Sequence, residues 1–131
     1  MEKEFSEIPV NRFFDFSLVS CSDKHAELRM PLKPSYLQEG EVVHGGIISA
    51  LADTTAVYAI YPQIPNHQTM TSIEFKVNFL APASLADGRL RAVASIVKRG
   101  KKIVVCEVEV FQKEKLIAKG LFTYLVFKRK D

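Results

Sequence analysis

The sequence predicts an α+β domain in which an antiparallel sheet of about six strands curls around one long central helix. Three observations favour this arrangement. The stretch Gly46–Tyr61 reads as a helix that is apolar around nearly its whole circumference. Most of the chain after it alternates in the manner of strands joined by short polar turns, and such strands must pair antiparallel. A flat sheet would touch only one side of this helix, so we expect the sheet to curl and a second subunit to cover the rest.

Size and composition describe one ordinary globular domain, expected to span residues 1–131. Apolar residues make up 47% and charged residues 25%, and the net charge of +3 gives little support for a nucleic-acid partner. The N-terminus lacks the apolar core of a signal peptide, and no apolar stretch is long enough to span a bilayer. We therefore expect a cytoplasmic protein that binds neither membrane nor nucleic acid, with Cys21 and Cys106 as small reduced hydrophobes.

The elements before the helix are short. We expect, in order, a helix or turn over residues 6–15, strands over 16–22 and 26–31, and a loop over 32–43. The helix itself begins at the pair Gly45-Gly46 and ends before Pro62, where a proline cannot continue it.

The second half begins with a loop at 63–68 and continues as strands. Residues 72–79 alternate, so Phe75 and its apolar neighbours should share one face and Ser72, Glu74, Lys76 and Asn78 the other. Further strands are expected over 88–96, 103–111 and 117–127, with turns at 99–102 and 112–115.

Asp53 is the one carboxylate in the middle of the apolar helix. Burying a carboxylate costs free energy unless it is paired or used, so this residue is a candidate for catalysis. The other interpretation is a structural Asp that bonds to a neighbouring strand or reaches solvent through a gap in the sheet.

Several short motifs in this order carry a resemblance to a known family. They are Gly40, Val43-His44-Gly45-Gly46, Leu51-Ala52-Asp53, the strand Thr71–Phe75 followed by Ala81-Pro82, Gly88 and Lys98-Arg99-Gly100-Lys101. Together they resemble the hotdog-fold acyl-CoA thioesterases, and most of all the phenylacetate-degradation (PaaI-like) branch. The resemblance implies hydrolysis of an acyl- or aryl-acyl-CoA to the free acid and CoA, with no cofactor beyond the CoA of the substrate. It also implies a homodimer with two equivalent shared sites, and a homotetramer built from two dimers.

The two glycines suit thioester hydrolysis, which needs donors for a developing oxyanion. Gly45 and Gly46 lie at a helix N-terminus, where backbone N–H groups are free, and glycine lets a carbonyl approach closely. They would equally serve as a tight entry into the helix. Asp53 would be the base or nucleophile, but it lies about 12 Å further along the helix axis. Both groups must approach one carbonyl carbon, so we expect Gly45 from one subunit to act with Asp53 from the other.

The remaining candidates rest mainly on the resemblance. Ser72, or its neighbour Thr71, matches a hydroxyl that orients water or substrate, although a solvent-facing strand residue explains it as well. Gln38 stands where relatives often carry an Asn that contacts the thioester. His44 is either a general acid or a residue that shapes the loop. The turn Arg99-Gly100-Lys101 either meets the phosphates of CoA or is simply a soluble turn.

Two other functions stay open. A non-catalytic protein that binds or senses acyl-CoA would use the same pocket. A hotdog-fold hydratase or dehydratase would need an acid/base pair centred on a His, and no His lies within a turn of Asp53. We expect no metal site, because His25 and His67 have no partner at ligand spacing.

Overall fold

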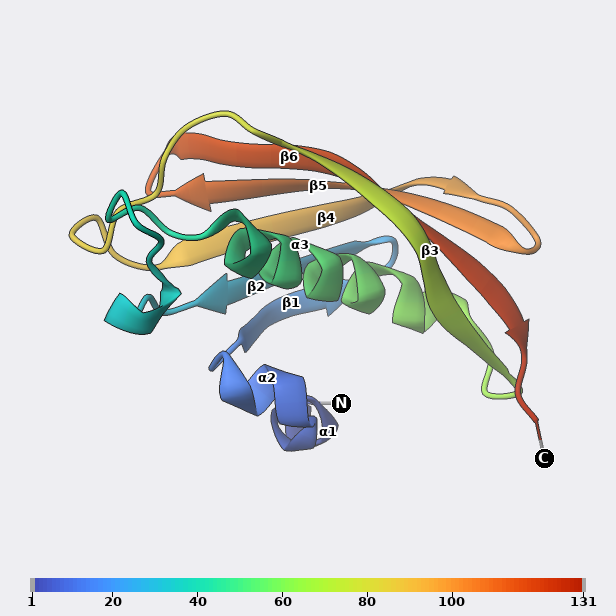
Figure 1. Ribbon diagram of the computed structural model, residues 1–131. Coiled ribbons are helices and arrows are strands. Elements are labelled where there is room, and N and C mark those ends of the chain that lie inside the picture. The colour runs from blue at the N-terminus through green and yellow to red at the C-terminus, as the bar shows by residue number, and fades with distance from the viewer. Residues whose placement is uncertain (1, 131) are drawn as a thin grey trace.

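The computed structural model describes residues 2–130 and contains a six-stranded antiparallel sheet in the order β1-β2-β4-β5-β6-β3. The elements in chain order are α1 (Glu2–Glu7), α2 (Pro9–Phe13), β1 (Ser17–Ser22), β2 (His25–Met30), a 3-10 turn (Pro34–Tyr36), α3 (Gly45–Ile60), a second 3-10 turn (Tyr61–Gln63), β3 (Gln68–Phe79), β4 (Leu90–Arg99), β5 (Ile103–Gln112) and β6 (Lys115–Lys128). Figure 1 shows α3 lying along one face of the curled sheet. The expected α+β architecture is confirmed.

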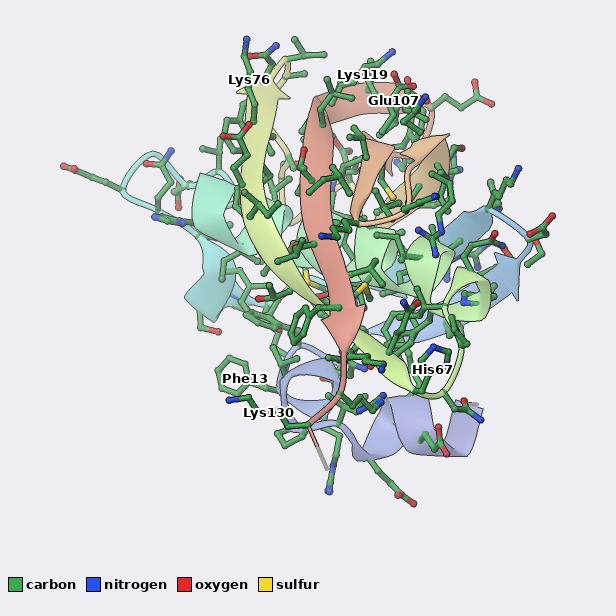
Figure 2. The ribbon with its side chains drawn as sticks, turned by 90° about the vertical axis from the view of Figure 1, so that its right-hand side faces the viewer. Phe13, His67, Lys76, Glu107, Lys119 and Lys130 are labelled. Atoms are coloured by element: carbon green, nitrogen blue, oxygen red, sulfur yellow. The ribbon has the colours of Figure 1, made fainter. Side chains whose placement is uncertain are left out.

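The core lies between α3 and the inner face of the sheet. Strands β2, β4 and β5 bury alternate residues against the helix, among them Leu28, Ala92 and Val108, which are all at most 1% exposed. The outer face carries charged side chains instead. Figure 2 shows Lys119 and Glu107 near one another on this face, where their charged atoms lie 3.8 Å apart. None of the helices within residues 2–130 is long and apolar enough to cross a membrane.

Several element boundaries differ from the expectation by a few residues, and two of them bear on the candidate site. The central helix is Gly45–Ile60 rather than Gly46–Tyr61, because His44 is the N-cap and Tyr61 already begins the 3-10 turn that contains Pro62. Strand β3 begins at Gln68, inside the stretch expected to be a loop, because it pairs with β6 along its whole length. The pairing, rather than any alternation in residues 68–71, makes this segment a strand.

A β-bulge in β3 changes which residues share a face. Ser72 is opposite Tyr124 and Glu74 is opposite Thr123, so Ile73 is the extra residue. Directly opposed residues project to the same side of an antiparallel pair. Ser72 therefore shares the inner face with Tyr124 and Phe75, and its expected place beside Glu74 is wrong. Simple alternation misplaces Ser72 because the extra residue of the bulge shifts the residues before it to the opposite face of the sheet.

Helix α3 is not covered on all sides within one chain. Its covered side consists of fully buried residues such as Leu51, Ala56 and Ile60. A half-exposed stripe runs along the other side, and we refer to it as the open side of α3; its members are Ile47, Ala50, Asp53, Thr54 and Val57. Their spacing of three and four residues places them on one face of the helix. One chain therefore leaves uncovered a side of the helix that we expect a second subunit to cover.

Candidate active site

The N-terminus of α3 presents one free backbone donor. His44 has extended backbone geometry (φ −61°, ψ 134°), and its Nδ1 accepts a 2.9 Å hydrogen bond from the Gly46 N–H. The His44 carbonyl accepts from the N–H groups of Ile47 and Ile48. Among the described residues, nothing accepts from the Gly45 N–H. This geometry makes His44 the cap of the helix and leaves Gly45 to donate to a bound group.

A cavity of about 380 Å³ opens at Gly45. Its lining is mostly apolar and comprises Gln38, Val42, Val43, Gly45, Ile48 and residues 79–83. The ring of Phe79 lies against Gly45, since a Cβ added at Gly45 would come within 3.1 Å of its Cζ. The Gln38 Oε1 accepts a 3.2 Å hydrogen bond from the Gly40 N–H. Gln38, from the expected loop, and Gly45, at the start of the helix, therefore line one cavity.

Asp53 is half-buried on the open side of α3 and is held by Tyr124. The Tyr124 hydroxyl donates to the Asp53 carboxylate Oδ1 and also lies 3.1 Å from the Asp53 backbone carbonyl oxygen. Tyr124 is 1% exposed, and burial, followed by the negative charge of Asp53, raises its pKa well above the usual value. The hydroxyl therefore stays protonated and acts as a permanent donor that fixes one carboxylate oxygen.

Tyr124 is the residue that sequence reasoning missed. Alternation in the last strand places it on the inner face, but nothing in the pattern shows that it meets Asp53, which lies 71 residues earlier. Ser72 is its directly opposed partner on β3, so the bulge brings Ser72 to the same side of the sheet as the Asp53–Tyr124 pair. Thr71 is opposite Leu125 and projects to the outer face.

One chain does not bring Asp53 to Gly45. They are eight positions apart on one straight helix, about 12 Å along its axis, and Asp53 is not among the residues that line the Gly45 cavity. A carbonyl held by the Gly45 N–H of one chain is therefore out of reach of the carboxylate of that chain.

The turn Arg99-Gly100-Lys101 lies at the end of the sheet opposite Gly45 (Figure 1). The Gly100 N–H donates to the Ile103 carbonyl at 2.8 Å, and a Cβ at Gly100 would lie 2.8 Å from that oxygen, so the turn requires glycine here. The Arg99 Nη1 donates to the Gly100 carbonyl. Lys101 is exposed.

The described residues 2–130 contain no group of three or more His, Cys, Asp or Glu side chains placed to hold a metal ion. Cys106 is fully buried, and burial raises the pKa of its thiol to about 12, so it is not a ready nucleophile at neutral pH. Within residues 2–130, the Gly45 N–H and the Asp53–Tyr124 pair are therefore the groups on α3 that we consider for chemistry.

Comparison with known proteins places these features in context. The model of the Thioesterase superfamily matches residues 40–119. The medium/long-chain acyl-CoA thioesterase YigI of Escherichia coli (strain K12) is 26% identical over 135 residues, which cover 91% of this chain and 86% of YigI.

Solved structures share the fold along almost the whole chain. Conserved protein PA5202 from Pseudomonas aeruginosa has a TM-score of 0.88 and 30% identity, covering 97% of this chain and all of that one. The PaaI protein of the E. coli phenylacetic acid degradation operon has a TM-score of 0.86 and 22% identity, covering 95% and 88% of the two chains. These similarities confirm the expected hotdog fold.

Proposed function

The chain belongs to the thioesterase superfamily, and on that premise we propose that it hydrolyses the thioester of an acyl- or aryl-acyl-CoA to the free acid and CoA. The observation that carries the proposal is the pair of groups on α3. The Gly45 N–H has no acceptor among the described residues, and the Asp53 carboxylate is held by a hydrogen bond from Tyr124. The largely apolar cavity at Gly45 suits an apolar acyl group. The activity for which YigI is named supports the same substrate class.

In the proposed reaction the Gly45 N–H donates to the thioester oxygen as negative charge develops on it. Asp53 of the partner subunit takes a proton from water, and that water adds to the carbonyl carbon; the C–S bond then breaks and the thiolate of CoA receives the proton. Direct attack by the carboxylate, followed by hydrolysis of the anhydride, uses the same residues. Ser72 would orient the water and Gln38 the thioester.

A homodimer completes this site. Strand β3 is an edge of the sheet, is 12 residues long, and leaves Ile73, Phe75 and Phe79 between 45% and 53% exposed. A long apolar edge strand is a ready template for pairing with another chain. Pairing of β3 with its copy about a two-fold axis would set the open sides of the two α3 helices against each other.

Assembly of two dimers into a tetramer is part of the same proposal. Leu121 and Phe127 project from the outer face of β6 and are 49% and 41% exposed. They offer apolar contact to a second dimer. In this proposal the protein acts in the cytoplasm and needs no cofactor other than the CoA carried by its substrate.

The role of the Gly45 N–H can be tested by two matched variants. Gly45→Ala adds a Cβ and keeps the backbone N–H. Gly45→Pro also adds a Cβ but removes the backbone N–H. Gly45 is the first residue of the helix, a position that accepts proline, and His44 already has the extended backbone favoured before proline. With acyl-CoAs of several lengths and free thiol as readout, we expect Gly45→Pro to have a kcat about 100-fold below that of Gly45→Ala. Equal rates for the two would contradict an oxyanion role.

Sharing of the site is tested by mixing chains. A heterodimer of an Asp53→Ala chain and a Gly45→Pro chain has one site with both groups intact and one with neither. We expect about half the wild-type activity from purified heterodimers, while either homodimer is nearly inactive. No recovery in heterodimers would contradict a shared site. Tight binding of acyl-CoA by the wild type without any thiol release would instead favour a non-catalytic acyl-CoA sensor.

A further inference from the structure

A second cavity, of about 420 Å³, lies at the start of β4 and is lined by four cationic side chains and a single carboxylate. Arg29 comes from β2, Arg89 and Arg91 flank the first residue of β4, and Lys113 lies in the turn between β5 and β6. These cations are spread over the sequence, and only the pairing of β2, β4 and β5 gathers them. The carboxylate is Asp87.

Two of the four cations have an acidic partner within 4 Å, and the other two have none among the described residues. The Lys113 Nζ lies 3.7 Å from Asp87, and the Arg29 Nε lies 3.7 Å from Glu27, longer than a hydrogen bond. The Arg29 Nε is nonetheless buried and has no hydrogen-bond partner in the described chain. The Cζ of Arg91 lies over the ring of Phe111, 4.6 Å from its centre, and this contact supports the guanidinium from one side. Arg89 is exposed and forms no ion pair with any described residue.

The rim of the cavity is fixed by a buried glutamine. Gln112 is 1% exposed; its Nε2 donates to the carbonyls of Ser84 and Gly88 at 2.6 and 2.7 Å, and its Oε1 accepts from the Ser84 N–H at 3.0 Å. Gly88 has a φ of +88°, a conformation that suits glycine. The cations therefore surround a preformed depression rather than a loose loop.

The same loop connects this cavity to the candidate active site. Residues 79–83 line the cavity at Gly45, and residues 87–89 line the basic one. The Ala83 carbonyl also accepts a hydrogen bond from Val43, next to the helix start. A ligand in the basic cavity would thus lie on the far side of a short, anchored loop from the reacting carbonyl.

We propose that the cavity formed by Arg29, Arg89, Arg91 and Lys113 binds a phosphate-bearing anion. Arginines match phosphate oxygens with pairs of N–H donors, and several cations facing one carboxylate favour an anion with more than one charge. Two kinds of ligand carry such phosphates. One is the CoA substrate, through its nucleotide phosphates, and this case rests on the proposed function. The other is a free phosphate compound that would bind against residues 87–89 of the loop.

Titration calorimetry with inorganic pyrophosphate tests the site without any need for turnover. We expect the double variant Arg29→Gln/Arg89→Gln to bind pyrophosphate at least about tenfold more weakly than the wild type. Lys24→Asn is the control: it removes one charge at the far end of β2, and asparagine tolerates the φ of 63° found there, so affinity should stay unchanged. Equal binding by wild type and double variant, or no binding by the wild type, would overturn the proposal.

Kinetics then separates the two sources. If the phosphates are those of the substrate, the double variant raises KM for acyl-CoA and leaves KM unchanged for the matching acyl-pantetheine, which lacks the nucleotide. If the ligand is a free phosphate compound, KM for both thioesters stays at the wild-type value although pyrophosphate affinity is lost. Should the wild type hydrolyse no thioester, the calorimetry still decides whether the anion site exists.

Discussion

The two sides of α3 have similar apolar residues but different surroundings. The covered side packs against β2, β4 and β5 and is fully excluded from water, whereas the open side, from Ile47 to Val57, is half-exposed. The covered side holds apolar groups and a Thr whose hydroxyl bonds back to the Leu51 carbonyl at 2.7 Å. The open side holds Asp53, the one carboxylate of the helix.

This difference indicates that the two sides of the helix have different roles. Packing on the covered side fixes the position of α3 relative to the sheet. Tyr124, on strand β6, holds the Asp53 carboxylate on the open side by a hydrogen bond. A charged group that must accept and return a proton can persist only where it is not sealed in the core. The open side therefore combines the candidate chemistry with the surface that would meet a second subunit.

The largest effect is expected from Asp53→Asn. The amide has the shape of the carboxylate but cannot take a proton or attack, so kcat should fall about 1000-fold. Thr54→Ala, one position along the same side of α3, should keep a rate within about threefold of the wild type. Thiol release from acyl-CoA under saturating substrate measures both. An active Asp53→Asn enzyme would remove Asp53 from the mechanism.

A charge on the edge strand should separate the subunits. Ile73 is the bulged residue of β3 and is 52% exposed; Ile73→Lys should weaken dimerisation about 100-fold, and activity should fall with it. The control is Val97→Lys, because Val97 is also a bulge residue and 60% exposed but lies on the interior strand β4. Sedimentation over a range of concentrations gives the assembly state. Unchanged assembly of Ile73→Lys would exclude pairing through β3.

Truncations on the two sides of α3 should differ in how protein concentration affects them. Leu51 is 0% exposed, and Leu51→Ala should cost about 3 kcal/mol of unfolding free energy at any protein concentration. Val57→Ala, on the open side, should cost about 1 kcal/mol when the subunits are apart. It should cost more when they are together, because the second subunit would then cover Val57. Urea unfolding at two protein concentrations measures both, and a concentration-independent Val57→Ala would argue against a contact there.

The smallest effect is expected from Tyr124→Phe. Losing the donor frees the Asp53 carboxylate to rotate, so kcat should fall about tenfold with little change in KM. Because burial raises the pKa of Tyr124, the hydroxyl stays protonated, and this ratio should be constant from roughly pH 6 to pH 9. The Tyr124 pKa is higher in the folded chain than in the unfolded chain. As the pH rises, the tyrosine therefore ionises first in the unfolded state, and this ionisation favours unfolding. The wild type should therefore lose stability above about pH 10, where that tyrosine ionises.

The sequence by itself predicted the elements whose signals are local. The apolar helix with its glycine start and proline end, the alternation of the last three strands and a turn within residues 112–115 all follow from short-range stereochemistry. Gly45 and Asp53 became candidates in the same way, since a glycine at a helix start and a carboxylate in an apolar helix are visible without a fold.

Only the tertiary structure decided the features that depend on distant partners. The bulge at Ile73, which returns Ser72 to the inner face, comes from the register of β3 against β6. The bond from Tyr124 to Asp53 and the gathering of Arg29 with Arg89 depend on strands far apart in the chain. The open side of α3 reflects how far the sheet curls. Pairing geometry and curvature are set by all the strands together, so no local pattern determines them.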